Sequence, residues 1–273
     1  MQDPPSPHIP DRRFPHDRPF DVHCAAAGRC AGGVYLPQRP HGQGAAGAKL
    51  LGYGALSCLP AIVVELILSA VIERLNVRSV YLGYFLEAFV VAGLTEETCK
   101  FLFLRTTWRN PAFDYQFDAI VYAVMVALGF AAFENVKYVY SYGFATGIVR
   151  AVTAVPGHAI FGVFMGYFYG YAKLSDYWGR DDDRKAYLAL SVVVPVLLHG
   201  CYDFLAFAQE SDSRFTLLFY AYLIALYVFG IRRVNRSARD DRRVTRETVF
   251  DYFRRMQYPM PPQYRDRNDD FWR

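Results

Sequence analysis

The chain has 273 residues, of which 53% are hydrophobic and 17% aromatic, and its formal net charge is +4. Charged residues make up 21% of the sequence, and they concentrate at the two ends and in short segments between long apolar stretches. A soluble domain spreads its charges along every amphipathic element, and a nucleic-acid-binding domain needs a basic surface with a recognisable motif, so both classes are excluded. The distribution is typical of a protein with several membrane spans.

The first 48 residues are rich in Pro, Arg, Gly and His, and no apolar segment precedes Lys49. They lack the apolar core of a signal peptide, so we expect a disordered cytoplasmic tail over residues 1–48. Cys24 and Cys30 lie in this tail near His23, but their spacing fits no common zinc motif. The remaining cysteines lie in apolar stretches, where a thiol packs as a small hydrophobic group.

Apolar stretches of about 20 residues, the length that crosses the hydrocarbon core as a helix, predict an all-α membrane protein. We expect a bundle of about six transmembrane helices joined by short loops, within residues 49–232. Pro60, Pro156 and Pro195 fall inside spans and predict kinks. The expected spans are about Leu50–Ile72, Tyr81–Leu104, Phe117–Tyr140, Gly147–Leu174, Ala186–Ala208 and Phe215–Ile231.

Basic residues predict the orientation of these spans. Lys and Arg are frequent in the amino tail, in the second-to-third and fourth-to-fifth connections, and in the carboxyl tail over residues 233–273. The other connections hold only Arg74 and Arg78, then Arg150, then Arg214. Because cytoplasmic loops carry the excess of Lys and Arg, both termini are expected in the cytoplasm of a multi-pass cell-membrane protein. An amphipathic stretch, Arg246–Met256, could lie on the inner leaflet, but a solvated tail is favoured.

Ionisable side chains inside the expected spans point to a working site. Each costs roughly 2.5–3.5 kcal/mol at the centre of a membrane helix, so they must face one another or a wet cavity. Apolar packing would stabilise a bundle as well, so a purely structural role does not explain them. They are Glu65, Glu87, Glu96, Glu97, Lys100, Glu134, Lys137, His158, His199 and Asp203.

The spacing of these residues groups them on helix faces. Glu96 and Lys100 lie one turn apart on one face, and Glu97 lies about 100° around the helix from Glu96. His199 and Asp203 share the same spacing in another span. Phe130 and Glu134 repeat it, with Asn135 next to Glu134, and His158 lies in a fourth span. Four helices therefore each offer polar groups to the interior of the bundle.

Several chemistries fit this set. A buried Glu could take a proton from water and return it to a leaving amine, while a His stabilises the oxyanion or orients the water. Alternatively, His158, His199, Asp203 and Glu134 could hold a divalent metal such as zinc, although the chain has no HExxH motif. Nucleophilic catalysis is weaker, because no Ser or Cys lies in a recognisable nucleophile setting. Glu65 and Glu87 stand apart and could be structural or could line a cavity.

Two function classes other than hydrolysis remain open at this stage. A proton-coupled transporter also uses buried carboxylates and His, but such proteins usually contain an internal repeat, and none relates the first three spans to the last three. A non-catalytic membrane scaffold would use the polar groups only to bind helices together. Asn135 could have only this structural role of joining helices, and Lys100 could simply pair with Glu96.

Four short motifs, in order on successive spans, resemble those of the PrsW family of intramembrane proteases. The segment Glu96-Glu97-Thr98-Cys99-Lys100 looks like its EExxK motif, and Phe130 to Asn135 resembles FxxxEN. Pro156-Gly157-His158 resembles the third, His-bearing motif, and His199 to Asp203 matches HxxxD. The resemblance covers roughly Leu82 to Phe204 and neither tail.

The resemblance implies a function and site roles. The family belongs to a superfamily with the CAAX-prenyl endopeptidases and bacteriocin-processing proteins, and its named member makes the first cut in an anti-sigma factor. By resemblance, Glu96, Glu97, His158 and His199 are catalytic, and Lys100, Phe130, Glu134, Asn135 and Asp203 support them. The expected partners are a membrane-anchored protein substrate and the lipid bilayer, with no nucleic acid. A glutamate mechanism is favoured over a metal-dependent one, and the sequence does not fix the oligomeric state.

Overall fold

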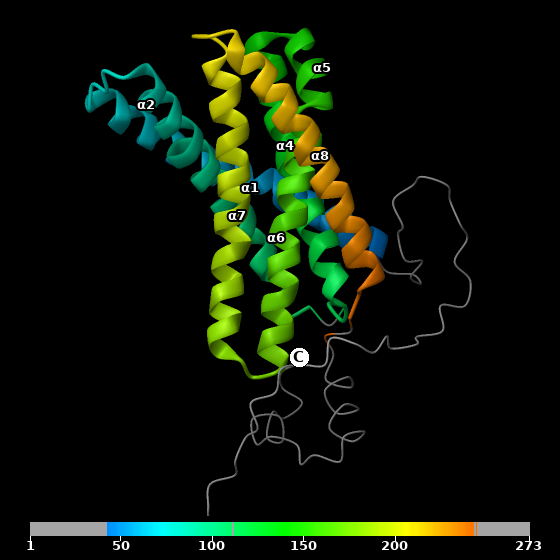
Figure 1. The fold of residues 1–273 in the computed structure, drawn as a ribbon. Coiled ribbons are helices and arrows are strands. Elements are labelled where there is room, and N and C mark those ends of the chain that lie inside the picture. The colour runs from blue at the N-terminus through cyan, green and yellow to red at the C-terminus, as the bar shows by residue number, and fades with distance from the viewer. Residues whose placement is uncertain (1–42, 111, 243, 245–273) are drawn as a thin grey trace, which may run out of the picture. The chain divides into compact units, whose positions relative to one another are not determined.

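All the elements of the computed structural model are helices among the residues that it describes, which are 43–110, 112–242 and 244, with only the backbone for 43–46. The predicted tails lie outside this range except at their inner ends, and so do Cys24, Cys30 and the Arg246–Met256 stretch. Figure 1 shows the helices in chain order: α1 Gln43–Arg74, α2 Val80–Phe85, η1 Leu86–Leu94, α3 Thr95–Leu104, η2 Arg105–Thr107, α4 Gln116–Tyr142, α5 Phe144–Val152, α6 Ala154–Tyr177, α7 Asp181–Ala208 and α8 Arg214–Arg239.

The prediction of an all-α membrane bundle is confirmed. Five segments of the described chain are long and apolar enough to cross a membrane, namely Gly47–Arg74, Gln116–Tyr142, Phe144–Tyr177, Asp181–Ala208 and Arg214–Arg239. The remaining expected span is helical from Val80 to Leu104, but it is not among these five. It carries Glu87, Glu96, Glu97 and Lys100, and these charges lower its affinity for lipid.

That span differs from a plain α-helix. Its middle third, η1, is a π-helix, in which hydrogen bonds run from residue i to i+5, and α3 follows it directly. The π-helix lies against α7, where a Cβ added to Gly93 would stand 3.1 Å from the carbonyl oxygen of Val196 and 3.3 Å from the amide of Gly200. This close approach of two backbones places the start of α3 beside the middle of α7.

The expected fourth span, Gly147–Leu174, is two helices rather than one. The helix α5 ends at Val152 and α6 begins at Ala154, with Thr153 between them. The reason is Pro156, which lacks an N–H and whose ring would clash with the carbonyl of Val152 in a continuous helix. At the first turn of α6 the missing N–H breaks no hydrogen bond, because those amides have no helical partner anyway.

The helices α4 and α6 form the most extensive pair in the bundle. Their backbones approach closely at three glycines of α6 spaced four residues apart, Gly162, Gly166 and Gly170. A Cβ added to Gly166 would stand 2.5 Å from the carbonyl oxygen of Ala119 and 2.5 Å from the Cα of Ile120. Small residues at this spacing let two membrane helices pack along their length, and this pair is the frame on which Glu134 and His158 sit.

We expect Gly166→Ala to destabilise the folded bundle by about 1–3 kcal/mol, because the new methyl group meets backbone atoms that cannot move independently. Thermal unfolding of the protein in detergent measures the change. The matched control is Gly52→Ala on α1, where nothing lies within 4 Å of the added Cβ. If both variants melt at the wild-type temperature, the close α4–α6 contact is wrong.

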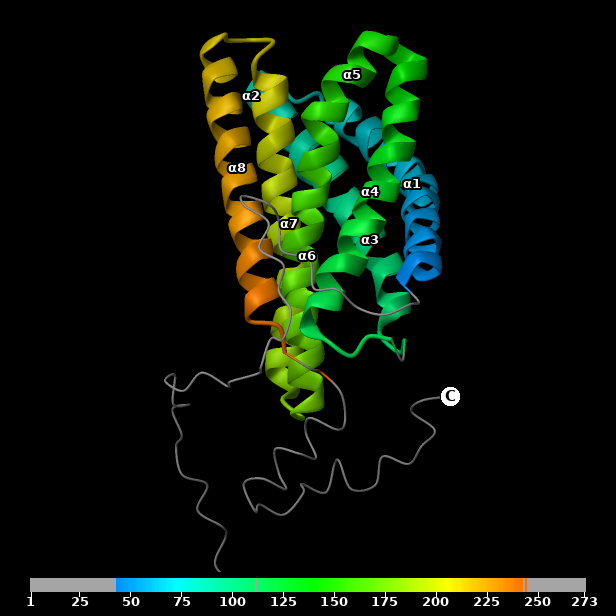
Figure 2. The same cartoon turned by 90° about the vertical axis from the view of Figure 1, so that its right-hand side faces the viewer.

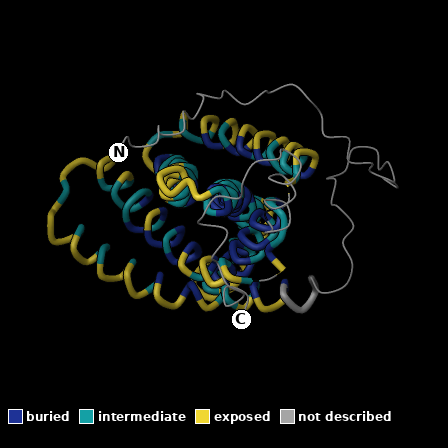
Figure 3. Tube along the Cα trace, turned by 90° about the horizontal axis from the view of Figure 1, so that it is seen from below, coloured by how far each residue is buried: buried dark blue, intermediate teal, exposed yellow. Residues whose placement is uncertain are grey.

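The remaining helices surround this pair. In Figure 2, α8, α7, α6, α4 and α1 follow one another across the view, and α7 and α8 both pack on α6. Figure 3, seen along the bundle, shows buried positions turned toward the interior and exposed positions turned outward. The outward positions are largely apolar, for example Val63, Leu66, Leu217 and Ile224. In water such a surface would be costly, and in a bilayer it is the surface that contacts lipid.

One basic residue is not where the sequence placed it. Lys173 stands at the end of the expected span Gly147–Leu174, and we counted it among the basic residues of the fourth-to-fifth connection; however, α6 continues to Tyr177 and Lys173 is buried. Its ammonium donates to the carbonyl oxygen of Trp108 at 2.5 Å and lies 4.9 Å from the centre of the Trp108 ring. Lys173 therefore ties the chain that follows α3 to α6, and so helps to hold α3 in the bundle.

Candidate active site

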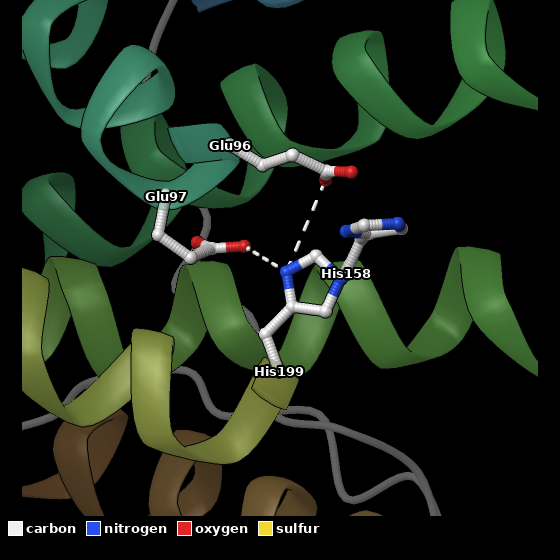
Figure 4. A group of neighbouring side chains, drawn as sticks. All are labelled: Glu96, Glu97, His158 and His199. Carbon is white, nitrogen blue, oxygen red and sulfur yellow. Dashed lines mark hydrogen bonds and ion pairs between the residues drawn. The ribbon is translucent and has the colours of Figure 1, made fainter. Parts of the chain in front are cut away.

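Four helices bring the sequence-predicted residues together. Glu96, Glu97 and Lys100 come from α3, Glu134 from α4, His158 from α6, and His199 and Asp203 from α7. The i, i+3 and i, i+4 spacings within α3 and α7 place each group on one helix face, as the sequence indicated. Figure 4 shows Glu96 and Glu97 reaching from α3 toward the two imidazoles of α6 and α7. All of these side chains except Asp203 are buried.

Lys100 occupies the centre of the cluster. Its ammonium lies 2.7 Å from Glu97 Oε1, 3.2 Å from Glu96 Oε2 and 3.0 Å from His158 Nδ1. The ring of Phe130 lies beneath it, 4.1 Å from the ammonium to the ring centre. Lys100 therefore does more than pair with Glu96: its single ammonium contacts both carboxylates and joins α3 to α6.

His199 lies between two carboxylates. Its Nδ1 is 2.9 Å from Glu97 Oε1 and 3.9 Å from Glu96 Oε2, while its Nε2 is 3.2 Å from Asp203 Oδ2. An ionised carboxylate only accepts hydrogen bonds, so both ring nitrogens donate when all three groups are charged. Phe161 stacks on the ring at 4.9 Å and fixes its plane.

His158 has a different environment. Its Nε2 lies 3.0 Å from Glu134 Oε2, and its Nδ1 faces the ammonium of Lys100. An ammonium can only donate, so Nδ1 must accept, and the ring hydrogen belongs on Nε2. The contacts thus assign His158 as a neutral imidazole whose tautomer is fixed by Glu134 on one side and Lys100 on the other.

A cavity of about 350 Å³ opens beside the cluster, with walls from α1, η1, α3, α4, α5, α6 and α7. Glu96, His158, His199 and Asp203 all line it, whereas Glu97 and Lys100 do not. Glu97 has no exposed surface, and its Oε2 is buried without a hydrogen-bond partner among the described residues. The two members of the Glu pair are therefore not equivalent, because only Glu96 meets the space in which a substrate could bind.

Glu65 and Glu87, which the sequence left doubtful, also line this cavity. Ser69 of α1 donates to Glu87 Oε2 of η1 at 3.2 Å, so the two helices touch there. Neither carboxylate belongs to the group around Lys100. Lys137 also lines the cavity.

Asn135 lies apart from the cluster. Its side-chain amide donates to the carbonyl oxygen of Gly147 at 3.3 Å, which links α4 to α5. The sequence also missed Arg150, which it assigned only to an outer connection. Arg150 Nη2 lies 2.7 Å from Glu134 Oε2, so a basic residue six positions before Pro156 reaches into the site. The sequence held one clue to the role of Arg150: it is an isolated Arg in a connection that was expected on the side of the membrane with few basic residues.

The donor set has the chemistry of a metal site, and its arrangement brings four candidate ligands together. Glu96, Glu97, His158 and His199 offer ligand atoms within 4.8 Å of one another, and zinc takes carboxylate and imidazole ligands. This set differs from the expected one, since Glu134 and Asp203 instead bind the outer nitrogens of the imidazoles. The ammonium of Lys100 already lies among these atoms, and a metal ion would have to displace it.

Comparison with known proteins identifies close relatives. A family model described as PrsW family intramembrane metalloprotease matches residues 45–231. The chain is 35% identical over 185 residues to Protease PrsW of Oceanobacillus iheyensis, covering 67% of this chain and 79% of that protein. It is 37% identical over 168 residues to Protease PrsW of Bacillus subtilis, covering 61% and 72%. No solved structure matches the chain.

Proposed function

This chain belongs to the PrsW family of intramembrane proteases, and we propose that it hydrolyses a peptide bond of a membrane-anchored protein with Glu96 as the base that activates water. The position of Glu96 carries this proposal. It is the carboxylate of the Glu pair that lines the cavity, and Lys100 and His199 lie against it from within the bundle. Glu97 lies behind it and holds Lys100 and His199 in place.

The reaction needs only groups of this chain and one water molecule. Glu96 takes a proton from the water as the water oxygen bonds to the carbonyl carbon of the substrate. The carbonyl oxygen then carries the negative charge of the tetrahedral intermediate. When the carbon–nitrogen bond breaks, Glu96 returns the proton to the leaving amine, and a carboxylic acid and an amine result.

His199 is the group that we assign to stabilising the oxyanion. It lines the cavity beside Glu96, and its place between Glu97 and Asp203 favours the imidazolium. A positive charge held close to the developing negative charge, in a site that excludes bulk water, is among the largest contributions to catalysis. His158 and Glu134 have a supporting role, because they orient Lys100 from the opposite side.

We further propose that the resident cation of the site is Lys100 and not a metal ion. The relatives' family is described as a metalloprotease family, so this is a specific difference in mechanism. A bound zinc ion would activate water as a Lewis acid, whereas in our scheme Glu96 activates it as a general base. What supports the proposal is the ammonium that contacts three of the four candidate ligands at 2.7–3.2 Å.

The position of the cavity supports the proposed substrate class. Glu65 and Leu66 of α1 line it, and Leu66 keeps 68% of its surface exposed on the lipid-facing side of the same helix. A membrane-anchored protein could approach along α1 and place an unwound segment against Glu96. By resemblance, a single-span regulator of the anti-sigma-factor kind is the proposed substrate.

Both termini are proposed to lie in the cytoplasm, with the tails over 1–48 and 233–273 flanking the membrane domain. The connection between α7 and α8 is then external. In a cysteine-free background, a membrane-impermeant maleimide should label Ser213→Cys in intact cells, and should label Asp182→Cys at the start of α7 only after lysis. The reverse pattern would invert the topology.

Cleavage by the reconstituted protein tests the proposed function. Purified protein in liposomes would be combined with a library of single-span membrane proteins, and the products would be identified by mass spectrometry. We expect cuts in or directly beside the transmembrane segment of at least one substrate. Proton-coupled solute flux without any proteolysis would instead favour a transporter.

A further inference from the structure

The short helix α5 is a separate piece of the site. It runs for nine residues from Phe144 to Val152 between α4 and α6. One side is apolar and at least half exposed: Phe144, Ile148, Val149 and Val152. The other side carries buried Gly147 and largely buried Arg150. A helix of this kind lies with its apolar side in the bilayer and its polar side on the protein.

Two contacts fix where α5 sits. Asn135 donates its side-chain amide to the carbonyl oxygen of Gly147 at 3.3 Å. Gly147 packs directly on α4, since a Cβ there would stand 2.2 Å from Val139 Cγ2. Together these contacts hold α5 against the last turns of α4, at Val139 and at Asn135, which directly follows Glu134.

The packing of α5 on α4 places the side chain of Arg150 beside Glu134. Its guanidinium lies 3.6 Å from the centre of the Tyr138 ring, and its Nη2 lies 2.7 Å from Glu134 Oε2. The same oxygen of Glu134 lies 3.0 Å from His158 Nε2. A carboxylate oxygen can accept from both, so Arg150, Glu134 and His158 form a continuous row of hydrogen bonds that ends at Lys100.

We propose that Arg150 is a positioning residue for hydrolysis, delivered to Glu134 by α5 and Asn135. It keeps Glu134 as an acceptor aimed at His158 Nε2, which leaves His158 Nδ1 free to accept from Lys100 and so fixes the ammonium between Glu96 and Glu97. Histidines in functional sites are commonly oriented by a carboxylate on the far nitrogen, and here the carboxylate itself is oriented by a cation. The proposal rests on the proposed function for its effect on rate, but not for its effect on His158.

Kinetics of Arg150→Gln in the liposome assay are the first test. We expect kcat to fall about 10–100-fold, the usual effect of losing such a partner, with KM changed less than about threefold. Arg150→Lys should recover part of the rate, because it keeps the charge but not the planar fork. Arg74→Gln, an exposed Arg at the end of α1, should retain the wild-type rate.

A double-mutant comparison separates positioning from general support of the fold. In a Glu134→Gln background, Arg150→Gln should cause no further loss, because its partner is already removed. An equal loss of kcat in both backgrounds would overturn the proposal, and so would a rise in KM with unchanged kcat.

The ¹⁵N spectrum of His158 gives a readout that needs no proteolysis. In wild-type protein its nitrogens should show the neutral form with hydrogen on Nε2, assigned by comparison with His158→Ala. In Arg150→Gln this signal should shift or broaden toward a mixture of tautomers. An unchanged His158 signal would overturn the proposal, whereas a changed signal in a protein that cleaves no substrate would count against the proposed function alone.

Discussion

Glu96→Gln should lower kcat for peptide-bond cleavage by about a hundredfold to ten-thousandfold, the range expected for loss of a general base. The amide has nearly the same size and can still accept from Lys100, so the bundle should remain folded. It cannot take a proton from water, and Glu96 is the member of the Glu pair that lines the cavity. The rate would be measured on a single-span substrate in liposomes, with thermal unfolding as the check on the fold.

Glu65→Gln is the matched control for this prediction. Glu65 is a carboxylate on α1 that lines the same cavity. It should lose far less activity than Glu96→Gln. A Glu96→Gln protein that cleaves at the wild-type rate would remove Glu96 as the base, and equal losses in both variants would mean that the cavity simply needs negative charge.

Lys100→Met should abolish cleavage and also destabilise the protein, because it leaves Glu96, Glu97 and the imidazole of His158 buried without the cation that contacts all three. Removing one partner of a buried ion pair typically costs 3–5 kcal/mol. Wild-type protein, in contrast, should keep its rate after exhaustive dialysis against a chelator. Cleavage rates, melting temperatures and metal content by mass spectrometry would be measured on the same samples.

The metal content of the purified protein tests whether the cation of the site is Lys100 or a metal ion. We expect purified wild-type protein to contain zinc far below one ion per chain. Stoichiometric zinc, with activity lost on chelation and regained on adding zinc, would contradict a Lys100-centred site. The matched control is Lys137→Met, a second lysine that lines the cavity outside the cluster, which should keep its fold and bind no metal.

Much of the bundle could be predicted because a membrane imposes a simple rule on length. A stretch such as Phe117–Tyr140 must be apolar for about 20 residues to cross, and the observed α4 starts one residue earlier and ends two later. The break at Thr153 was missed although Pro156 was seen, because a proline can either kink a helix or begin one. The π-helix of Leu86–Leu94 was missed because no local residue pattern specifies it.

The composition of the candidate site was predictable for a related reason. Buried charges are so costly in lipid that Glu96, Glu134, His158 and His199 had to meet, and spacing within each helix showed which side chains share a face. Which nitrogen faces which carboxylate depends on how helices far apart in the sequence pack, as for Glu97 and His199, 102 residues apart. Arg150 was missed because its place depends on the turn from α4 into α5.

The three contacts of Lys100 also bear on how the protein is made. Two of them, to Glu96 and Glu97, lie within α3 itself and are available as soon as that helix forms. The ribosome delivers His158 and His199 only later, so the weakly apolar Val80–Leu104 segment enters the bilayer before its partners exist. An internal ion pair lowers the cost of that entry. In the proposed mechanism His199 arrives only with α7, so we expect a chain that lacks α7 to be inactive during biosynthesis.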